Sequence, residues 1–381
     1  SLVPMASLGA TSPASLIPVE EFFRQDKLVD MKISPNGEYL AATVALADRT
    51  DLIFLSRNDS GVKLIARAGV KPKQHVSVFE WVNPSRVIFN INEQAGKLSQ
   101  PEPTTWTYGI NADGTQHTRV EAAEVIDTLH DSDSQVLVSD GRLVFFLNTY
   151  TGVLQDTKIK APMNTQRGHF HTDNSGLVRF FKTIRKKDIL STVHELDTVT
   201  REWKLLNSQS ETGLNIDVLG FSADNKFAYL SIEQATGPSA VYKHDFATGK
   251  REFLYKDDNV DPYHVYRSPL DGSVIGLRFL DGKPRVHILQ EQNEFAKDLA
   301  KLGKQFSGMD YVPTSYTSTG NLAVILAGSD KSPAEFFIYD KKANTLAPVF
   351  KAGQELGKTG LSAMLPVKFK ARDGLELEGF L

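Results

Sequence analysis

A short polar turn recurs along the chain at a nearly constant spacing, and this repeat limits the possible folds more than any other feature. The last residues of successive copies are separated by 48, 49, 42, 49, 47 and 48 residues, which is close to the period of propeller blades. The copies are Ser34-Pro35-Asn36-Gly37, Asn83-Pro84-Ser85, Asp131-Ser132-Asp133-Ser134, Asp173-Asn174-Ser175-Gly176, Ser222-Ala223-Asp224-Asn225, Leu270-Asp271-Gly272 and Ser318-Thr319-Gly320.

A strand-like segment follows each turn and leads to a second turn. Segments such as Phe227–Ile232 and Leu322–Leu326 are short and rich in β-branched, aromatic or other apolar residues, as is typical of strands packed between sheets. The second turn contains Asp, Asn or Gly, which tolerate the backbone of tight hairpins. Two turns per unit predict a four-stranded meander. We therefore expect an all-β fold, a seven-bladed β-propeller of four-stranded antiparallel blades, over residues 31–352.

One unit departs from this pattern. The sequence from Glu291 to Leu302 has helical periodicity, and four apolar side chains fall on one face of that helix: Phe295, Leu299, Leu302 and Phe306. We predict a short helical insertion in the last hairpin of the sixth blade. A packing element is the favoured interpretation, and a lid or partner-docking element is the alternative.

Composition excludes several classes of function. The 381 residues carry a net charge of −3 with both signs interspersed, whereas nucleic-acid binding needs clustered cations; we expect no nucleic-acid partner. The chain has no cysteine, which excludes disulfides, thiol nucleophiles and cysteine zinc sites. A membrane helix needs about 20 apolar residues; no segment has them, and no membrane span is expected.

The first residues differ from the rest. Residues 1–16 are small or apolar and uncharged, as at the end of a secretory signal near its cleavage site; a flexible chain end is the other interpretation. The signal interpretation predicts a periplasmic or secreted protein, and the alternative is a cytoplasmic one. Residues 17–30 lead into the propeller.

Catalytic motifs are absent from the sequence. The nearest approach to the Gly-x-Ser-x-Gly motif of hydrolases is Gly220-Phe221-Ser222-Ala223-Asp224, which lacks the second glycine. Ser222 also belongs to a repeat turn, so we interpret it as a turn residue. No phosphate-binding loop, dinucleotide-binding glycine motif or His-Glu-x-x-His zinc motif occurs.

His169-Phe170-His171 is a possible site. Residues two apart on a strand face the same side, but a metal site would need a third ligand that the sequence does not identify. Hydrogen-bonded histidines lining the central channel are the favoured interpretation. Acidic residues are spread over the turns with no acid and base pair. We therefore assign no catalytic, cofactor-binding or metal residue and expect no cofactor.

The C-terminal segment, residues 353–381, is interpreted as a linker followed by the first strands of another domain. Val367–Lys370 and Leu375–Leu381 alternate in polarity around the turn Arg372-Asp373-Gly374. This segment resembles the junction before the α/β-hydrolase domain in the prolyl oligopeptidase family of serine peptidases, especially its acylaminoacyl-peptidase and dipeptidyl-aminopeptidase-like branch. Gly328–Asp340 resembles that family's last blade. Ile17–Phe23 and Met31–Gly37 resemble its N-terminal region.

The resemblance implies a non-catalytic role. In that family the Ser, Asp and His triad lies in the hydrolase domain, here expected beyond Leu381, so this chain alone is expected to be inactive. The propeller would gate and select peptide substrates for the hydrolase domain of the same polypeptide. Some branches bind the substrate's amino end through a glutamate pair, a role we do not transfer to Glu20-Glu21.

Two other functions are alternatives to peptide gating. The first is a stand-alone propeller acting as a protein-binding scaffold, which a stop codon just after Leu381 would favour. Continuation of the reading frame into a Gly-x-Ser-x-Gly domain would favour the peptidase. The second is a propeller glycosidase, which needs a set of carboxylates that the sequence does not identify.

Overall fold

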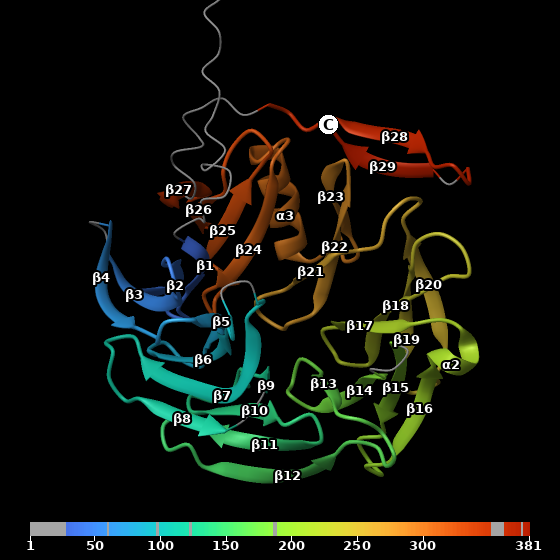
Figure 1. Ribbon diagram of the computed structural model, residues 1–381, viewed down its shortest axis with the longest axis horizontal. Coiled ribbons are helices and arrows are strands. Elements are labelled where there is room, and N and C mark those ends of the chain that lie inside the picture. Colours follow the sequence, from blue (N-terminus) through green and yellow to red (C-terminus); the bar gives the residue numbers. More distant parts are fainter. Residues whose placement is uncertain are drawn as a thin grey trace, which may run out of the picture.

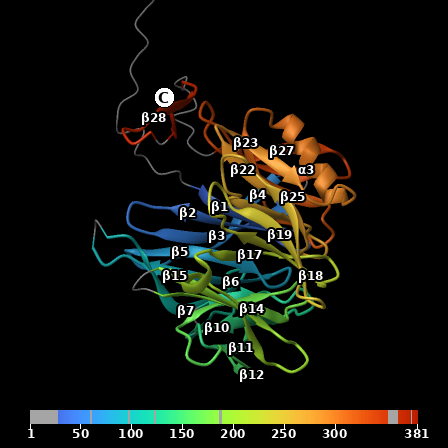
Figure 2. The same ribbon diagram turned by 90° about the vertical axis from the view of Figure 1, so that its right-hand side faces the viewer.

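The computed structural model describes residues 28–351 and 362–381, apart from 59–60, 97–98, 122–123, 186–188 and 375. Its sheets lie around a common axis, as in a β-propeller (Figure 1). The side view shows that the ring is shallow, with the C-terminal strands beside one of its faces (Figure 2). The N-terminal segment interpreted as a signal remnant or a flexible chain end, and most of the lead-in segment, fall in residues 1–27, outside the described residues.

The prediction of seven separate four-stranded blades is wrong in its count. The first two repeat units form one eight-stranded sheet, because Thr50 of β3 and His75 of β5 are bridged in parallel. Thr50 Oγ1 and His75 Nδ1 lie 3.1 Å apart at this bridge. Five blade-sized sheets follow, four with four strands and one with three.

The eight-stranded sheet has the order β1-β2-β3-β5-β6-β7-β8, and β4 pairs with β3. Its strands are β1 (Leu28–Ile33), β2 (Tyr39–Ala45), β3 (Thr50–Asn58), β4 (Gly61–Ala68), β5 (Gln74–Trp81), β6 (Arg86–Glu93), β7 (Glu102–Asn111) and β8 (Thr118–Glu121).

The five following sheets are antiparallel meanders, each made from consecutive strands. Their strands are β9 (Glu124–Asp127), β10 (Gln135–Ser139), β11 (Leu143–Asn148) and β12 (Leu154–Lys160); β13 (Gly168–Thr172), β14 (Val178–Arg185), β15 (Leu190–Leu196) and β16 (Trp203–Ser208); β17 (Ile216–Phe221), β18 (Phe227–Ile232), β19 (Ala240–Asp245) and β20 (Arg251–Lys256); β21 (His264–Arg267), β22 (Val274–Asp281) and β23 (Lys283–Ile288); and β24 (Asp310–Tyr316), β25 (Leu322–Gly328), β26 (Glu335–Asp340) and β27 (Thr345–Lys351). One short helix, α2 (Gln209–Thr212), follows β16.

A helix occupies the place of the fourth strand in the three-stranded sheet. Helix α3 (Glu294–Gln305) follows β23 and begins three residues later than predicted. Asn293 caps it by accepting a hydrogen bond from the N–H of Phe295 at 2.9 Å. The four apolar residues predicted to share a face, Phe295, Leu299, Leu302 and Phe306, are all buried. They pack in one cluster with residues of the sheets on both sides, which supports the packing interpretation.

The repeat turns have the backbone that their residues predict. Gly37 and Gly320 have φ of 81° and 68°, in the left-handed region that glycine adopts at little cost. A buried hydroxyl at the start of the turn closes several of them, accepting from the N–H five residues later. These bonds join Ser34 to Tyr39 at 3.0 Å, Ser222 to Phe227 at 3.1 Å and Thr317 to Leu322 at 3.2 Å.

The ring closes where β24 packs beside β1. The N–H of Ile33 donates to Ser315 Oγ at 2.7 Å, and the N–H of Ser318 donates to the carbonyl of Pro35 at 2.8 Å. These partners follow the same order along both strands, so β1 and β24 run in the same direction. The repeat turns therefore lie on one side of the ring, here called the turn face. The links between units lie on the other side, here called the connection face.

The C-terminal residues form the hairpin that the alternating pattern predicts. Strands β28 (Pro366–Lys370) and β29 (Glu376–Phe380) pair antiparallel. Both views place this hairpin beside β22 and β23 (Figures 1 and 2). The N–H of Met364 donates to Asp330 in the β25–β26 link at 2.7 Å, so the hairpin contacts the connection face.

Candidate functional site

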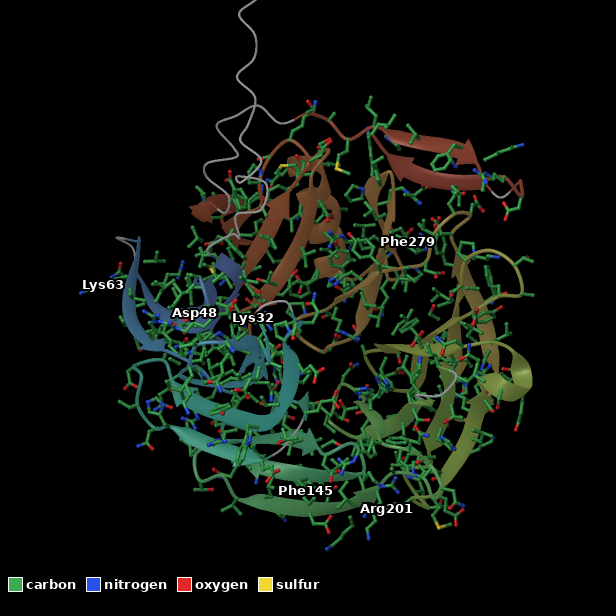
Figure 3. All side chains as sticks on the ribbon, viewed as in Figure 1. Lys32, Asp48, Lys63, Phe145, Arg201 and Phe279 are labelled. Carbon is green, nitrogen blue, oxygen red and sulfur yellow. The ribbon has the colours of Figure 1, made fainter. Side chains whose placement is uncertain are left out.

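The first strand of each unit lies nearest the axis, and these inner strands enclose a cavity, here called the axial cavity. Its volume is about 830 Å³, within the roughly 300–1,000 Å³ typical of small-ligand sites. Figure 3 shows Lys32 of β1 nearer the middle of the ring than Phe145 and Arg201, which lie toward its rim. The residues lining the cavity include Glu80 of β5, Glu124 and Asp127 of β9, His171 of β13, Gly220 of β17 and Arg267 of β21.

Ion pairs join the inner region of one unit to that of the next. Each pair places a carboxylate beside a cation from a neighbouring unit, so much of the charge around the axis is locally neutralised. The pairs are Lys32 with Glu80 at 2.5 Å, His169 with Glu124 at 3.1 Å, Lys182 with Asp217, and Arg278 with Asp310.

The two histidines identified in the sequence have different environments. His169 Nδ1 lies 3.1 Å from both carboxylate oxygens of Glu124, and this hydrogen bond raises the pKa of His169. His171 lines the axial cavity, and its buried Nε2 has no hydrogen-bond partner among the residues that the structure describes. Burial, with repulsion from His169 and Lys182, lowers the pKa of His171 to about 4. Among the described residues, His, Asp and Glu side chains form no group of three that could hold a metal ion.

His171 should make the stability of the propeller depend on pH. Because its pKa is about 4 in the folded chain and about 6.5 in the unfolded chain, folding favours the neutral imidazole. That stabilisation is complete above pH 6.5 and is lost as the pH falls toward 4. Between pH 7 and pH 5 we expect it to contribute about 2 kcal/mol to the loss of unfolding free energy.

The measurement is chemical unfolding at pH 7 and at pH 5. A His171→Gln variant should lose about 2 kcal/mol less than the unaltered chain over this interval. The same substitution at His130, an exposed residue, should leave the pH dependence unchanged. Equal pH dependence in all three proteins would contradict the prediction.

Ser222 is a turn residue, as the sequence predicts. Its hydroxyl donates to Asp224 at 2.8 Å and accepts from the N–H of Phe227 at 3.1 Å. No bond from Ser222 to an imidazole occurs among the described residues. A nucleophilic serine needs an adjacent base that takes its proton. Ser222 has no such bond among the described residues, and its hydroxyl instead closes a hairpin turn.

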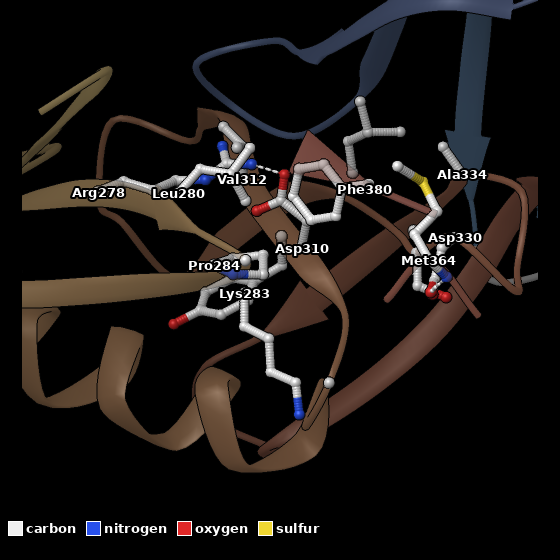
Figure 4. Close-up of a pocket in the computed structure, with 16 residues that line it drawn as sticks. Arg278, Leu280, Lys283, Pro284, Asp310, Val312, Asp330, Ala334, Met364 and Phe380 are labelled. Carbon is white, nitrogen blue, oxygen red and sulfur yellow. Dashed lines mark hydrogen bonds and ion pairs between the residues drawn. The ribbon is translucent and has the colours of Figure 1, made fainter. Parts of the chain in front are cut away.

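A second cavity lies under the C-terminal hairpin. Its volume is about 490 Å³. Figure 4 shows the paired Arg278 and Asp310 on one side, with Met364 and Phe380 from the hairpin segment facing the cavity. Gly282 of the β22–β23 link lies against Pro366. The hairpin thus covers part of the connection face with apolar side chains.

No helix in the described part of the chain is long and apolar enough to cross a bilayer.

Comparisons with known proteins give a sequence match to a peptidase and structural matches to solved chains. No protein-family model matches the sequence. Over 164 residues, 42% of the chain, the sequence is 24% identical to dipeptidyl aminopeptidase BIII of Pseudoxanthomonas mexicana, and the match covers 23% of that protein. A structure from a study of two prolyl endopeptidases matches 94% of this chain and 54% of its own, with a TM-score of 0.59 and 10% identity. Apo prolyl oligopeptidase B from Galerina marginata matches 95% of this chain and 56% of its own, with a TM-score of 0.54 and 11% identity.

The chain spans about half the length of these solved structures, and the sequence match of 164 residues covers less than a quarter of the aminopeptidase. Sequence similarity and structural match together support the resemblance to the prolyl oligopeptidase family. The chain has the fold of a propeller of that family.

Proposed function

We propose that this propeller, of the prolyl oligopeptidase family, gates and selects peptide substrates for a serine peptidase domain that follows it in the same polypeptide. The observation that carries the proposal is the axial cavity, enclosed by inner strands and about 830 Å³ in volume. A helix with its side chains is about 10–12 Å across, so folded proteins are too large for this space. Short peptides in an extended conformation fit it.

The position of the hairpin supports this arrangement. Strands β28 and β29 lie at the connection face, against the β22–β23 and β25–β26 links. A domain that continues from this hairpin would sit on the connection face and cover the adjacent end of the axial cavity. Peptides would then reach the catalytic centre only through openings that the propeller limits.

Hydrolysis assays test the proposal. The chain of 381 residues should not hydrolyse peptide or acyl-peptide substrates and should not react with an active-serine probe. The longer polypeptide should react with the probe and cleave short peptides, yet cleave a long unfolded protein far more slowly because of its size. Turnover by the shorter chain, or equal rates on short peptides and long unfolded proteins, would contradict the proposal.

A further inference from the structure

Arg267 is the last residue of the inner strand β21 and lines the axial cavity near the turn face. Protein surrounds its side chain, yet solvent reaches it, because the guanidinium lies inside the cavity. Burial lowers the pKa of Arg267, and no charged neighbour in the described ranges offsets this effect. A guanidinium with protein on several sides and no charged partner attracts an anion that enters the cavity.

The neighbouring strand is shaped around this guanidinium. Arg267 Nη2 donates to the carbonyl of Leu219 at 2.5 Å. Leu219 lies in a β-bulge between Val218 and Gly220, where the pairing register of β17 shifts. Gly220 has φ of 145°, and a Cβ at this position would overlap the guanidinium of Arg267. β-bulges often lie beside functional sites, where they change the direction in which a side chain points.

Four other arginines of the propeller have an aspartate or several oxygens as partners of their Nη atoms, and Arg267 differs from them. Arg179, Arg278 and Arg285 each pair with an aspartate. Arg86 has no carboxylate but donates to four oxygens. Within the described part of the chain, Arg267 has no ion pair, and its guanidinium donates one hydrogen bond, to the backbone carbonyl of Leu219.

The carboxylates that line the same cavity already have partners. Asp127 accepts from the N–H of Leu129 at 2.7 Å and from Thr172 Oγ1 at 2.7 Å. Glu124 bonds His169, and Glu80 bonds Lys32. The positive charge of Arg267 is therefore not neutralised locally, and an anion entering the cavity would be attracted to it.

We propose that Arg267 binds a carboxylate of the peptide substrate inside the axial cavity. The inference rests on the proposed peptide-gating function and names the group that is recognised. A guanidinium binds a carboxylate through two parallel charge-assisted hydrogen bonds. An extended peptide of six residues is about 20 Å long, which matches the six residues of β17. A short peptide entering at the connection face can therefore bring its C-terminal carboxylate to Arg267.

A binding experiment on the chain tests this inference. The probes are a six-residue Ala/Ser peptide with a free C-terminal carboxylate, the same peptide amidated, and an amidated form with one aspartate. We expect the free acid to bind at least about tenfold more tightly than the amide. Recovery of binding by the aspartate peptide would mean that a side-chain carboxylate is accepted at the same site.

Variants locate the effect. Arg267→Gln should abolish the preference for the free acid, and Arg267→Lys should retain part of it, because lysine keeps the charge but not the paired donors. Arg142→Gln is the matched control, because Arg142 also donates to one backbone carbonyl, that of Thr165 at 2.7 Å, but is exposed outside the cavity. If the glutamine variant does not fold, judged by circular dichroism, the lysine variant carries the test.

Three results would overturn the inference: equal binding of acid and amide, an unchanged preference in the Arg267 variants, or no peptide binding to the folded chain. None of them would remove the gating proposal, which is tested by the size dependence of cleavage in the longer polypeptide. Loss of that size dependence, with the carboxylate preference intact, would instead contradict gating alone.

Discussion

Replacing Arg86 by alanine is expected to lower the free energy of unfolding by about 3–5 kcal/mol. Arg86 has no exposed surface. Its guanidinium lies 4.5 Å from the centre of the Tyr150 ring and donates to the carbonyls of Gln116 and Thr149 and to Thr118 Oγ1. Alanine would leave a cavity and remove the donors from both carbonyls, which is costly inside a protein.

The position of Arg86 explains why the effect should extend beyond one sheet. Arg86 begins β6 in the eight-stranded sheet, whereas Thr149 and Tyr150 belong to the turn after β11 in the next sheet. Gly109 of β7 makes room, because a Cβ there would overlap the guanidinium. Arg86 therefore joins two neighbouring sheets, and its loss should weaken the contact between them.

Denaturant unfolding of the variants provides the measurement. The free energy of unfolding of Arg86→Lys should lie between those of the unaltered chain and Arg86→Ala. Lysine keeps the charge but has no planar guanidinium that can donate to several acceptors at once. Arg142→Ala should change stability by less than about 0.5 kcal/mol, as is usual for exposed sites. A cost below about 1 kcal/mol for Arg86→Ala would show that the acceptors find other donors.

The turns were the predictable part of this fold, because each depends on a few adjacent residues. Gly37, Gly176, Asn225, Gly272 and Gly320 end predicted repeat turns, and all five have positive φ. The residue types alone identify such positions. The number of separate sheets depends instead on a contact between units, Thr50 with His75, which periodicity within one unit cannot reveal.

The candidate site was less predictable than the fold. Sequence reasoning identified His171, which lines the axial cavity, and His169, which is hydrogen-bonded but is not among the lining residues. It missed Arg267, although a signal is present. Ser34, Ser222, Ser268 and Thr317 occupy equivalent positions, because the N–H of each bonds the carbonyl five residues later. The residue before the first, second and fourth of them is Ile33, Phe221 or Tyr316, whereas Arg267 precedes Ser268. A charged residue at an otherwise uncharged repeat position indicates a local role. Gly220 was noted only as part of an incomplete nucleophile motif, and its bulge depends on tertiary contacts with Arg267.

Replacing Phe295 by alanine should cost about 3–5 kcal/mol of unfolding free energy if helix α3 stands in for a fourth strand. Phe295 is 2% exposed. Its ring lies 6.0 Å from that of Tyr316 in an edge-on arrangement, and Lys341 Nζ lies 3.9 Å from its centre. Gly320 approaches so closely that a Cβ there would overlap the ring. The ring thus fills a space that no shorter side chain can fill.

The same variant separates packing from a lid function. Lys297 is an exposed residue on the same helix, so Lys297→Ala should change stability by less than about 0.5 kcal/mol. If α3 were a lid, Phe295→Ala would leave stability nearly unchanged and alter access of peptides to the axial cavity. If α3 is a packing element, stability falls while the folded fraction keeps its peptide affinity. The α3 side chains pack in one cluster with residues of the sheets on both sides of the helix, so we expect the second outcome: three strands leave a gap in the ring, and the helix fills it.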